Sequence, residues 1–442
     1  MWDLVLTQIL FVVGLPWIGV AAKLGSAHAM YWMLAILTFY IPCAAVVIFL
    51  NSKWPLEGGL YQWARHAFGP FTGFLTAWNL WLYVIMLTSE SGLQVVTYVA
   101  YAVNRPDIAS NKLLICAANV GVCVLLTWLS IAGLHFGKWL HNVAGVVIVV
   151  AFVTIIVLAA FTGRYHPVPL AMPAVSLFSV NILSKLGFGA LGGFEYVAIL
   201  AGETRKAVRS FAGSVLIAAP VIGLMFILGT SAVIAVVQGG EIELIGPVAQ
   251  VLSLGAKPFG LATQAVSLAI CMVASLRVAQ ASVNFTGNTR LPMVAGWDHL
   301  LPKWFTKIDP KRGTPVNSIL FVGAATLAVS MLSLIGVGHE EAFQLLWNTS
   351  IVFYALPYLV MFAIPLVVPA PLWLRMAAVS GFVMTFLGIL FAVVPIIDVK
   401  STWIFAAKMT GVVIAGNVLG VLIYLGRAAI TASSSSSAPA KK

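Results

Sequence analysis

Charged residues are scarce in this chain. Only 8% of its 442 residues are Asp, Glu, Lys or Arg, whereas 61% are hydrophobic. Soluble proteins carry about 25% charged residues, so the composition excludes an ordinary soluble protein. Apolar runs of about 20 residues, the length that crosses a hydrocarbon core of about 30 Å as a helix, recur along the whole chain. The sequence therefore predicts an integral, multi-pass membrane protein.

The signatures of several other function classes are also missing. The four cysteines form no Cys-x-x-Cys pair and no Cys/His set with zinc spacing, so we expect no metal site and no cofactor. The chain has no Gly-Lys-Ser phosphate-binding loop, which argues against ATP-driven transport by this chain alone. It has no constellation of His, Cys or Asp at membrane depth that would make it an enzyme. The first apolar segment has a Gly/Pro interruption and lacks a basic start, so we expect no cleavable leader.

Twelve segments have the length and apolar character of transmembrane helices. They predict an all-α membrane domain over residues 1–431, followed by a disordered serine-rich tail over residues 432–442. Helices 1–5 cover about 6–161, helices 6–10 about 176–368 and helices 11–12 about 376–426. The twelve predicted helices are 6–24, 29–50, 71–101, 112–132, 138–161, 176–203, 210–237, 259–288, 316–336, 343–368, 376–397 and 403–426.

Positive charge is distributed unevenly between the predicted loops. The net charge is +11, and with a cytoplasmic N-terminus 15 Lys and Arg residues fall in inner loops and tails against 7 in outer loops. The positive-inside rule expects this asymmetry. We therefore interpret the basic clusters as topology signals and expect no nucleic-acid partner. We expect a plasma (inner) membrane protein with both termini in the cytoplasm.

Glycine-rich interruptions occur in the first and sixth predicted helices, over 13–19 and 187–195. A broken helix frees backbone N–H and C=O groups that lipid cannot satisfy, so breaks persist only inside protein or beside a polar cavity. A matching pair in the two halves of a chain indicates the binding site of a transporter. The alternatives are a plain proline kink at the first and a helix-packing face of small residues at the second. The predicted substrate-binding residues here are Gly14, Leu15, Pro16, Trp17, Ile18, Gly19, Gly189, Gly192, Gly193, Phe194 and Glu195.

Four ionisable residues lie at membrane depth: Glu90, Lys185, Glu195 and Arg277. Charge inside a membrane is costly and indicates function by default. Two acids and two bases sum to zero, so pairing would let all four stay charged, and purely structural ion pairs are the alternative. We expect Glu90 and Glu195 to neutralise a substrate amine or to carry a proton. We assign all four to ion or proton coupling, and Glu90 also to substrate binding.

Three fragments combine distinctive residues in a fixed order. They are Pro55…Glu57-Gly58-Gly59…Tyr61…Trp63 with Ala67-Phe68-Gly69-Pro70, Gly193-Phe194-Glu195 with Ala201-Gly202-Glu203, and Arg290…Leu301-Pro302…Thr314-Pro315. Together they resemble the amino acid–polyamine–organocation (APC) transporters over most of residues 10–335. The resemblance implies a leucine-transporter-type fold, a 5+5 inverted repeat with broken helices 1 and 6 plus two extra helices. It also implies transport of amino acids or polyamines by alternating access.

The first break departs from that family, which usually has Gly-Ser-Gly where this chain has Gly14-Leu15-Pro16. Pro16 removes one donor, but its fixed φ suits the first position of a helix. The amides of residues 17–19 then open the outer half-helix, where the dipole favours an anion. At the second break the family often places an aromatic residue over the substrate, so Phe194 is the candidate gate. The alternative for Phe194 is a core or lipid-facing residue.

The resemblance also bears on the coupling ion. Sodium-coupled relatives bind the ion between helices 1 and 8, and some proton-coupled relatives place a lysine from helix 5 there. The predicted fifth helix has no lysine between Val143 and Ala160. We therefore expect Arg277, which stays protonated, to supply a permanent charge near that place. Sodium would then be unnecessary, and Glu195 or Glu90 would carry any proton.

These observations predict a secondary transporter of amino acids, sodium-independent, and either proton-coupled or exchanging. The closest rival is a polyamine or other organic-cation carrier, which the two buried carboxylates favour and the two buried cations oppose. A non-transporting membrane receptor on the same scaffold is a further alternative. The expected partners are a small-molecule substrate (amino acid or polyamine), a coupling proton or exchanged substrate, and membrane lipids.

Overall fold

The computed structural model describes residues 2–54, 59–132, 137–163, 165, 175–193, 207–260, 263–295, 297 and 300–436. Every regular element in these ranges is a helix, and ten helical spans are long and apolar enough to cross a membrane. Helices satisfy their own backbone groups, which hydrocarbon requires. The prediction of an all-helical, multi-pass membrane protein is confirmed.

The ten spans match ten of the twelve predicted segments in position. Two of them contain more than one helix, because a π-helical turn (Ile36–Tyr40) or a turn at Glu90 separates consecutive helices. The spans are Gly25–Lys53, with α3 (His28–Ala35) and α4 (Ile41–Lys53); Pro70–Ala102, with α6 (Pro70–Ser89) and α7 (Ser91–Ala102); Lys112–Ala132 (α8); Val143–Phe161, in α9 (Gly137–Phe161); Gly213–Val237, in α12 (Ala207–Val237); Thr263–Met293, in α14 (Thr263–Val294); Val316–Ser333 (α16); His339–Val367 (α17); Leu372–Ala392 (α18); and Thr402–Gly426, in α19 (Thr402–Ser436).

The first predicted helix is interrupted where its Gly/Pro segment falls. The chain forms α1 (Trp2–Val12), leaves helical geometry and resumes as α2 (Pro16–Ala22). The sixth segment begins as α10 (Leu177–Ser184) and continues as a π-helical turn, η5 (Lys185–Ala190). Neither segment offers a continuous helix long enough to span a bilayer on its own within the described residues.

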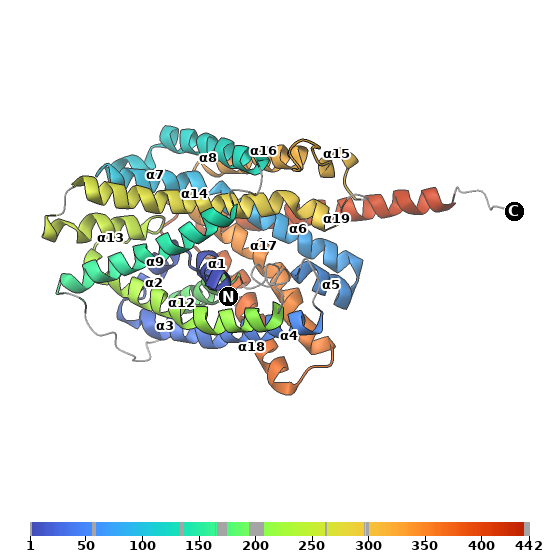
Figure 1. The fold of residues 1–442 in the computed structure, drawn as a ribbon, viewed down its shortest axis with the longest axis horizontal. Helices are drawn as coiled ribbons and strands as arrows, with labels where there is room; N and C mark the ends of the chain where they lie inside the picture. The colour runs from blue at the N-terminus through green and yellow to red at the C-terminus, as the bar shows by residue number, and fades with distance from the viewer. Residues whose placement is uncertain are drawn as a thin grey trace.

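Both interrupted segments pack against long helices, and Figure 1 shows α1 and α2 beside α9 and α12. α1 packs against α9 and α12, α2 against α12 and α13 (Pro247–Gly255), and η5 against α18 and α3. α14 packs against α7 and α9, and α17 against α6 and α18. The breaks therefore face protein on several sides, which is the setting in which non-helical backbone is tolerated at membrane depth.

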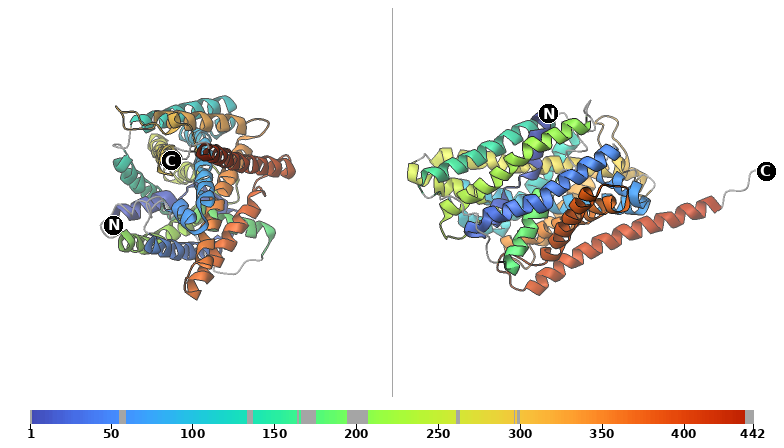
Figure 2. Two further views of the ribbon diagram at one scale, coloured as in Figure 1. Left: turned by 90° about the vertical axis from the view of Figure 1, so that its right-hand side faces the viewer. Right: turned by 90° about the horizontal axis from the view of Figure 1, so that it is seen from below.

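The last helix stands apart from this bundle. α19 (Thr402–Ser436) packs against α6 and α17, and its distal part projects beyond the other helices (Figures 1 and 2). Only 11% of the 18-residue apolar stretch that could cross the membrane is buried, so most of its apolar surface is available to lipid. α19 continues to Ser436, into the stretch for which the sequence predicts disorder, and residues 437–442 lie outside the described part.

Candidate functional site

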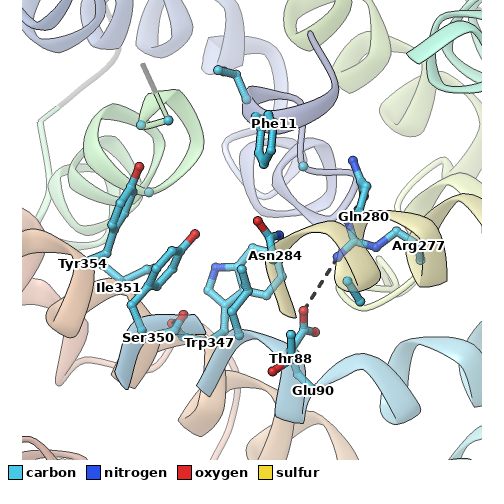
Figure 3. Close-up of a pocket in the computed structure, with 18 of the residues that line it drawn as sticks. Phe11, Thr88, Glu90, Arg277, Gln280, Asn284, Trp347, Ser350, Ile351 and Tyr354 are labelled. Carbon is cyan, nitrogen blue, oxygen red and sulfur yellow. Dashed lines mark hydrogen bonds and ion pairs between the residues drawn. The ribbon is translucent and has the colours of Figure 1, made fainter. Parts of the chain in front are cut away.

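A cavity of about 100 Å³ lies between the two interruptions. Its wall is formed by the end of α1, the end of the η5 segment, the junction of α6 and α7, one face of α14 and one face of α17 (Figure 3). The predicted site residues that line it are Gly14, Trp17, Glu90, Gly189, Gly192, Gly193 and Arg277. The structure thus brings residues from both breaks, and two of the four predicted membrane charges, to one cavity.

The first break frees a backbone carbonyl, and a side chain takes it up. The amide of Gly14 donates to Val12 O at 2.9 Å, so it does not reach the Leu10 carbonyl that a continuous helix would offer it. Gln280 Nε2 on α14 donates to Leu10 O instead, at 2.8 Å. The amide of Trp17 donates to Gly14 O at 3.2 Å. One of the three amides predicted to receive an anion is thus bonded within the break itself.

The remaining residues predicted at the first break lie behind the cavity. Leu15, Pro16 and Ile18 are buried. Gly19 lies against the loop before α13, where an added Cβ would lie 3.0 Å from the Glu243 carbonyl oxygen. These positions hold α2 against the surrounding helices, and their contact with a substrate stays a prediction.

The second break has a matching arrangement. Gly193 has a φ of +123°, a conformation that disfavours residues with a Cβ. Its amide donates to the Tyr358 hydroxyl on α17 at 3.0 Å. The other glycines of this segment lie in tight contacts, because an added Cβ would fall within 3.0 Å of a neighbouring side chain: Met384 for Gly187, Trp17 for Gly189 and Tyr354 for Gly192. The glycine run therefore serves close packing as well as the break.

Glu90 and Arg277 form an ion pair on one side of the cavity. Glu90 stands at the turn between α6 and α7 with 1% of its side chain exposed, and its Oε1 lies 3.6 Å from Arg277 Nη2 (Figure 3). Gln94 donates to the other carboxylate oxygen and accepts from Arg277 Nε. Arg277 Nη1 donates to Gln280. A buried ion pair is tolerable only when such extra hydrogen bonds satisfy the remaining charge, and two glutamines supply them here.

The opposite side of the cavity is aromatic. Trp347, Ile351 and Tyr354 of α17 line it (Figure 3). Tyr83 of α6 stacks on Tyr354 with ring centroids 4.3 Å apart. A ligand in this cavity therefore meets charge and amide groups on one side and ring surfaces on the other, which suits a small amphipathic molecule.

Lys185 is placed differently from Arg277. Its ammonium donates to the carbonyl oxygens of Phe391 at 2.8 Å and Val394 at 3.1 Å, and to Asn181. These carbonyls belong to the last turn of α18 and the loop after it. A cation that bonds the terminal carbonyls of a helix stabilises that end. The structure therefore gives Lys185 a capping contact, and its predicted part in coupling stays a prediction.

Other polar residues hold the same stretch of backbone. Lys23 Nζ donates to Ile396 O at 3.2 Å, and Gln344 accepts from Ile396 N at 3.1 Å. Asn348 donates to Ala392 O at 2.8 Å. We call this set the rim cluster; its members are Lys23, Asn181, Lys185, Gln344 and Asn348. It joins α2 and the α10–η5 segment to the end of α18 and the loop after it.

Two predicted residues, Phe194 and Glu195, lie outside the described residues. Several residues at the cavity were missed from the sequence. Gln94 is four residues after Glu90 and Gln280 three after Arg277, and residues at these spacings share a helix face, so the signal was present. The aromatic residues of α17 carried no such signal, because an aromatic side chain in an apolar helix is ordinary.

Comparison with known proteins gives a consistent result. The family model described as "Amino acid permease" matches residues 1–415. The chain is 25% identical to an uncharacterized transporter of Legionella pneumophila over 370 residues, covering 82% of this chain and 79% of that protein. It is 25% identical to an uncharacterized transporter of Mycobacterium tuberculosis over 72% of this chain and 71% of that protein. It is 23% identical to the vacuolar cationic amino acid transporter 8 of Arabidopsis thaliana over 84% of this chain and 62% of that protein.

Proposed function

Because the chain belongs to the amino acid permease family, we propose that it is a secondary transporter that moves amino acids by alternating access through the cavity between its two breaks. Family membership and the transporter relatives indicate a transporter rather than an enzyme. Two features support the finer statement. The cavity is bordered by both interrupted segments, and binding at paired breaks is the arrangement of many secondary transporters.

The proposed architecture has twelve transmembrane helices. The ten continuous spans supply ten of them, and the interrupted segments α1–α2 and α10–η5 would be the first and sixth. Helices 1–5 and 6–10 would form the inverted repeat, with α18 and α19 as the two extra helices. The excess of Lys and Arg in the predicted inner loops supports cytoplasmic termini in a plasma membrane.

The Glu90–Arg277 pair is the observation that carries the proposal. Both groups line the cavity, so a zwitterionic amino acid meets a carboxylate for its amine and a guanidinium for its carboxylate. Because the pair is neutral overall, it favours a cargo that is neutral overall. The aromatic wall of α17 then receives the side chain of the cargo, where burial of apolar surface contributes to affinity.

The same region supports sodium independence. The Leu10 carbonyl, freed by the break, accepts from Gln280, and Arg277 is bonded to Gln280 in turn. In the family that the sequence resembles, sodium-coupled members bind their ion between helices 1 and 8, and the Gln280 amide bonded to Leu10 O and the neighbouring Arg277 support the absence of such an ion here. We propose that transport is driven by a proton or by exchange, with Glu90 as the proton carrier among the described residues.

The test is uptake by the purified protein in liposomes. Radiolabelled amino acids are offered with sodium, and again with sodium replaced by choline, at several external pH values. The proposal expects saturable uptake that choline does not alter and that Glu90→Gln abolishes or makes insensitive to pH. Uptake that requires sodium would reject sodium independence, and ligand binding without flux would point to a receptor.

A cationic cargo is the second candidate function. One relative is named a cationic amino acid transporter, and Glu90 provides a buried carboxylate at the cavity. Arg277 opposes this reading, because it already compensates that carboxylate. Direct uptake separates the two: uptake of labelled arginine or putrescine, with no uptake of alanine, would favour the cationic cargo.

A further inference from the structure

The indole of Trp17 fills the space between the two breaks. Trp17 is the first residue after the proline of the first break, and its ring reaches across to the second break. An added Cβ on Gly14 would lie 2.7 Å from Trp17 Cδ1, and an added Cβ on Gly189 would lie 2.5 Å from Trp17 Cη2. The two ends of one indole therefore lie against one glycine from each interrupted segment.

The remaining sides of the ring are also defined. Trp17 lies edge-on to Trp347 with ring centroids 5.1 Å apart. Trp347 in turn contacts Phe343 at 5.0 Å, and Ile351 Cδ1 comes within 3.3 Å of the position of a Cβ on Gly189. The indole is thus fixed between two glycines and the aromatic wall of α17, and it is 4% exposed.

We propose that Trp17 is the residue that limits the size of the cargo, and that the carrier takes amino acids with small side chains. This inference rests on the proposed function. The cavity beside the indole is about 100 Å³, less than the roughly 150 Å³ of an apolar cavity that holds one benzene molecule. A cargo with a phenyl ring in addition to its amino and carboxyl groups therefore needs volume that the indole occupies.

The same geometry explains why position 189 is a glycine. A methyl group there would overlap the indole, whose Cη2 lies at 2.5 Å, so the ring beside the cavity would have to shift. Gly189 and Trp17 therefore act as a matched pair across the two breaks. Trp17→Leu alone enlarges the free space and Gly189→Ala alone reduces it, so the double variant has an intermediate free space.

Liposome uptake of alanine and phenylalanine tests the proposal in wild type, Trp17→Leu, Gly189→Ala and the double variant. The inference expects wild type to prefer alanine. Trp17→Leu should shift the alanine-to-phenylalanine ratio toward phenylalanine by on the order of tenfold, the discrimination that one or two methylenes give in an apolar pocket. Gly189→Ala should lower alanine uptake in the wild-type background and have little effect in the Trp17→Leu background, a non-additivity expected of groups in contact.

Two controls match these variants. Trp403→Leu removes a tryptophan that is 87% exposed on α19, and Gly287→Ala adds a methyl group on α14 where the structure has open space. Both should keep the wild-type ratio. If Trp17→Leu does not fold, Gly189→Ala decides alone: unchanged alanine uptake overturns the inference, and reduced uptake at normal yield supports it.

The outcomes separate this inference from the proposed function. Wild type that transports alanine and phenylalanine equally well, or a ratio that Trp17→Leu leaves unchanged, overturns the size limit and leaves amino acid transport standing. Wild type that takes up no amino acid of any size overturns both.

Discussion

Arg277 and Lys185 are both cations inside the membrane domain, yet the structure treats them differently. Arg277 faces a cavity and is balanced by the carboxylate of Glu90. Lys185 is bonded to the carbonyl oxygens of Phe391 and Val394 at the end of α18. The first arrangement leaves charge beside empty space, where a ligand can meet it. In the second arrangement the charge satisfies carbonyl oxygens at the end of a helix. A cation at membrane depth can therefore be structural or functional, and its hydrogen-bond partners distinguish the two.

The strongest test of this difference is Arg277→Met. It leaves the Glu90 carboxylate buried without its cation, and breaking a buried ion pair in this way costs about 3–5 kcal/mol of stability. We expect a large fall in the apparent melting temperature in detergent and loss of uptake. Arg277→Met combined with Glu90→Gln should recover most of the melting temperature, because no unpaired charge remains, but not the uptake. Recovery of uptake in the double variant would show that the pair is structural.

Lys185→Met tests the other cation of this comparison, the one bonded to the end of α18. It removes the donor to two partly buried carbonyls, and each such hydrogen bond contributes about 0.5–1.5 kcal/mol. We expect a lower apparent melting temperature, a reduced maximal uptake rate in proportion to folded protein, and an unchanged KM. Lys400→Met, at an exposed position, is the matched control and should change neither. A changed KM or pH profile in Lys185→Met would restore the predicted coupling role.

A smaller effect is expected for Lys23→Met. Lys23 donates a single hydrogen bond to Ile396 O and is only partly buried. Removal of one such bond costs about 0.5–1.5 kcal/mol. The shift in apparent melting temperature should therefore be smaller than that of Lys185→Met. A larger shift would mean that the rim cluster depends on α2 more than on the η5 segment.

A further test concerns the pH dependence of a buried acid with acidic neighbours. Glu243 lies in the loop between α12 and α13, where burial raises its pKa from 4.5 to about 7, with Glu340 and Glu241 adding to the shift. A carboxyl with a raised folded-state pKa contributes stability below its unfolded pKa, and that stability is lost as the pH rises through the folded pKa. The apparent melting temperature of wild type should fall between pH 4.5 and about pH 7. Glu243→Gln should flatten this fall, and an unchanged slope would contradict the assignment.

Much of the fold could be predicted from the sequence, because a bilayer imposes a simple rule on helix length and composition. The break before Pro16 could also be predicted, since proline lacks an amide and glycine has no Cβ. The ion partner of Glu90 could not be predicted from the sequence. Arg277 and Lys185 are equivalent in a list of buried cations, and only the packing of α14 against α7 decides which one reaches the carboxylate.

The sequence and the structure point to different parts of Trp17. The sequence indicated its backbone amide as an anion donor, because the amide opens a helix. In the structure that amide is bonded to Gly14 O, and it is the indole that borders the cavity. Side-chain direction depends on which residues lie across the gap, here Gly189, and no local pattern specifies that.

One consequence follows from how the breaks are satisfied. The Leu10 carbonyl and the Gly193 amide, both left over by helix interruption, are bonded to the side chains of Gln280 and Tyr358. Both hydrogen bonds join protein atoms only and require no bound substrate. The Leu10 carbonyl and the Gly193 amide therefore keep their hydrogen-bond partners when no substrate is bound.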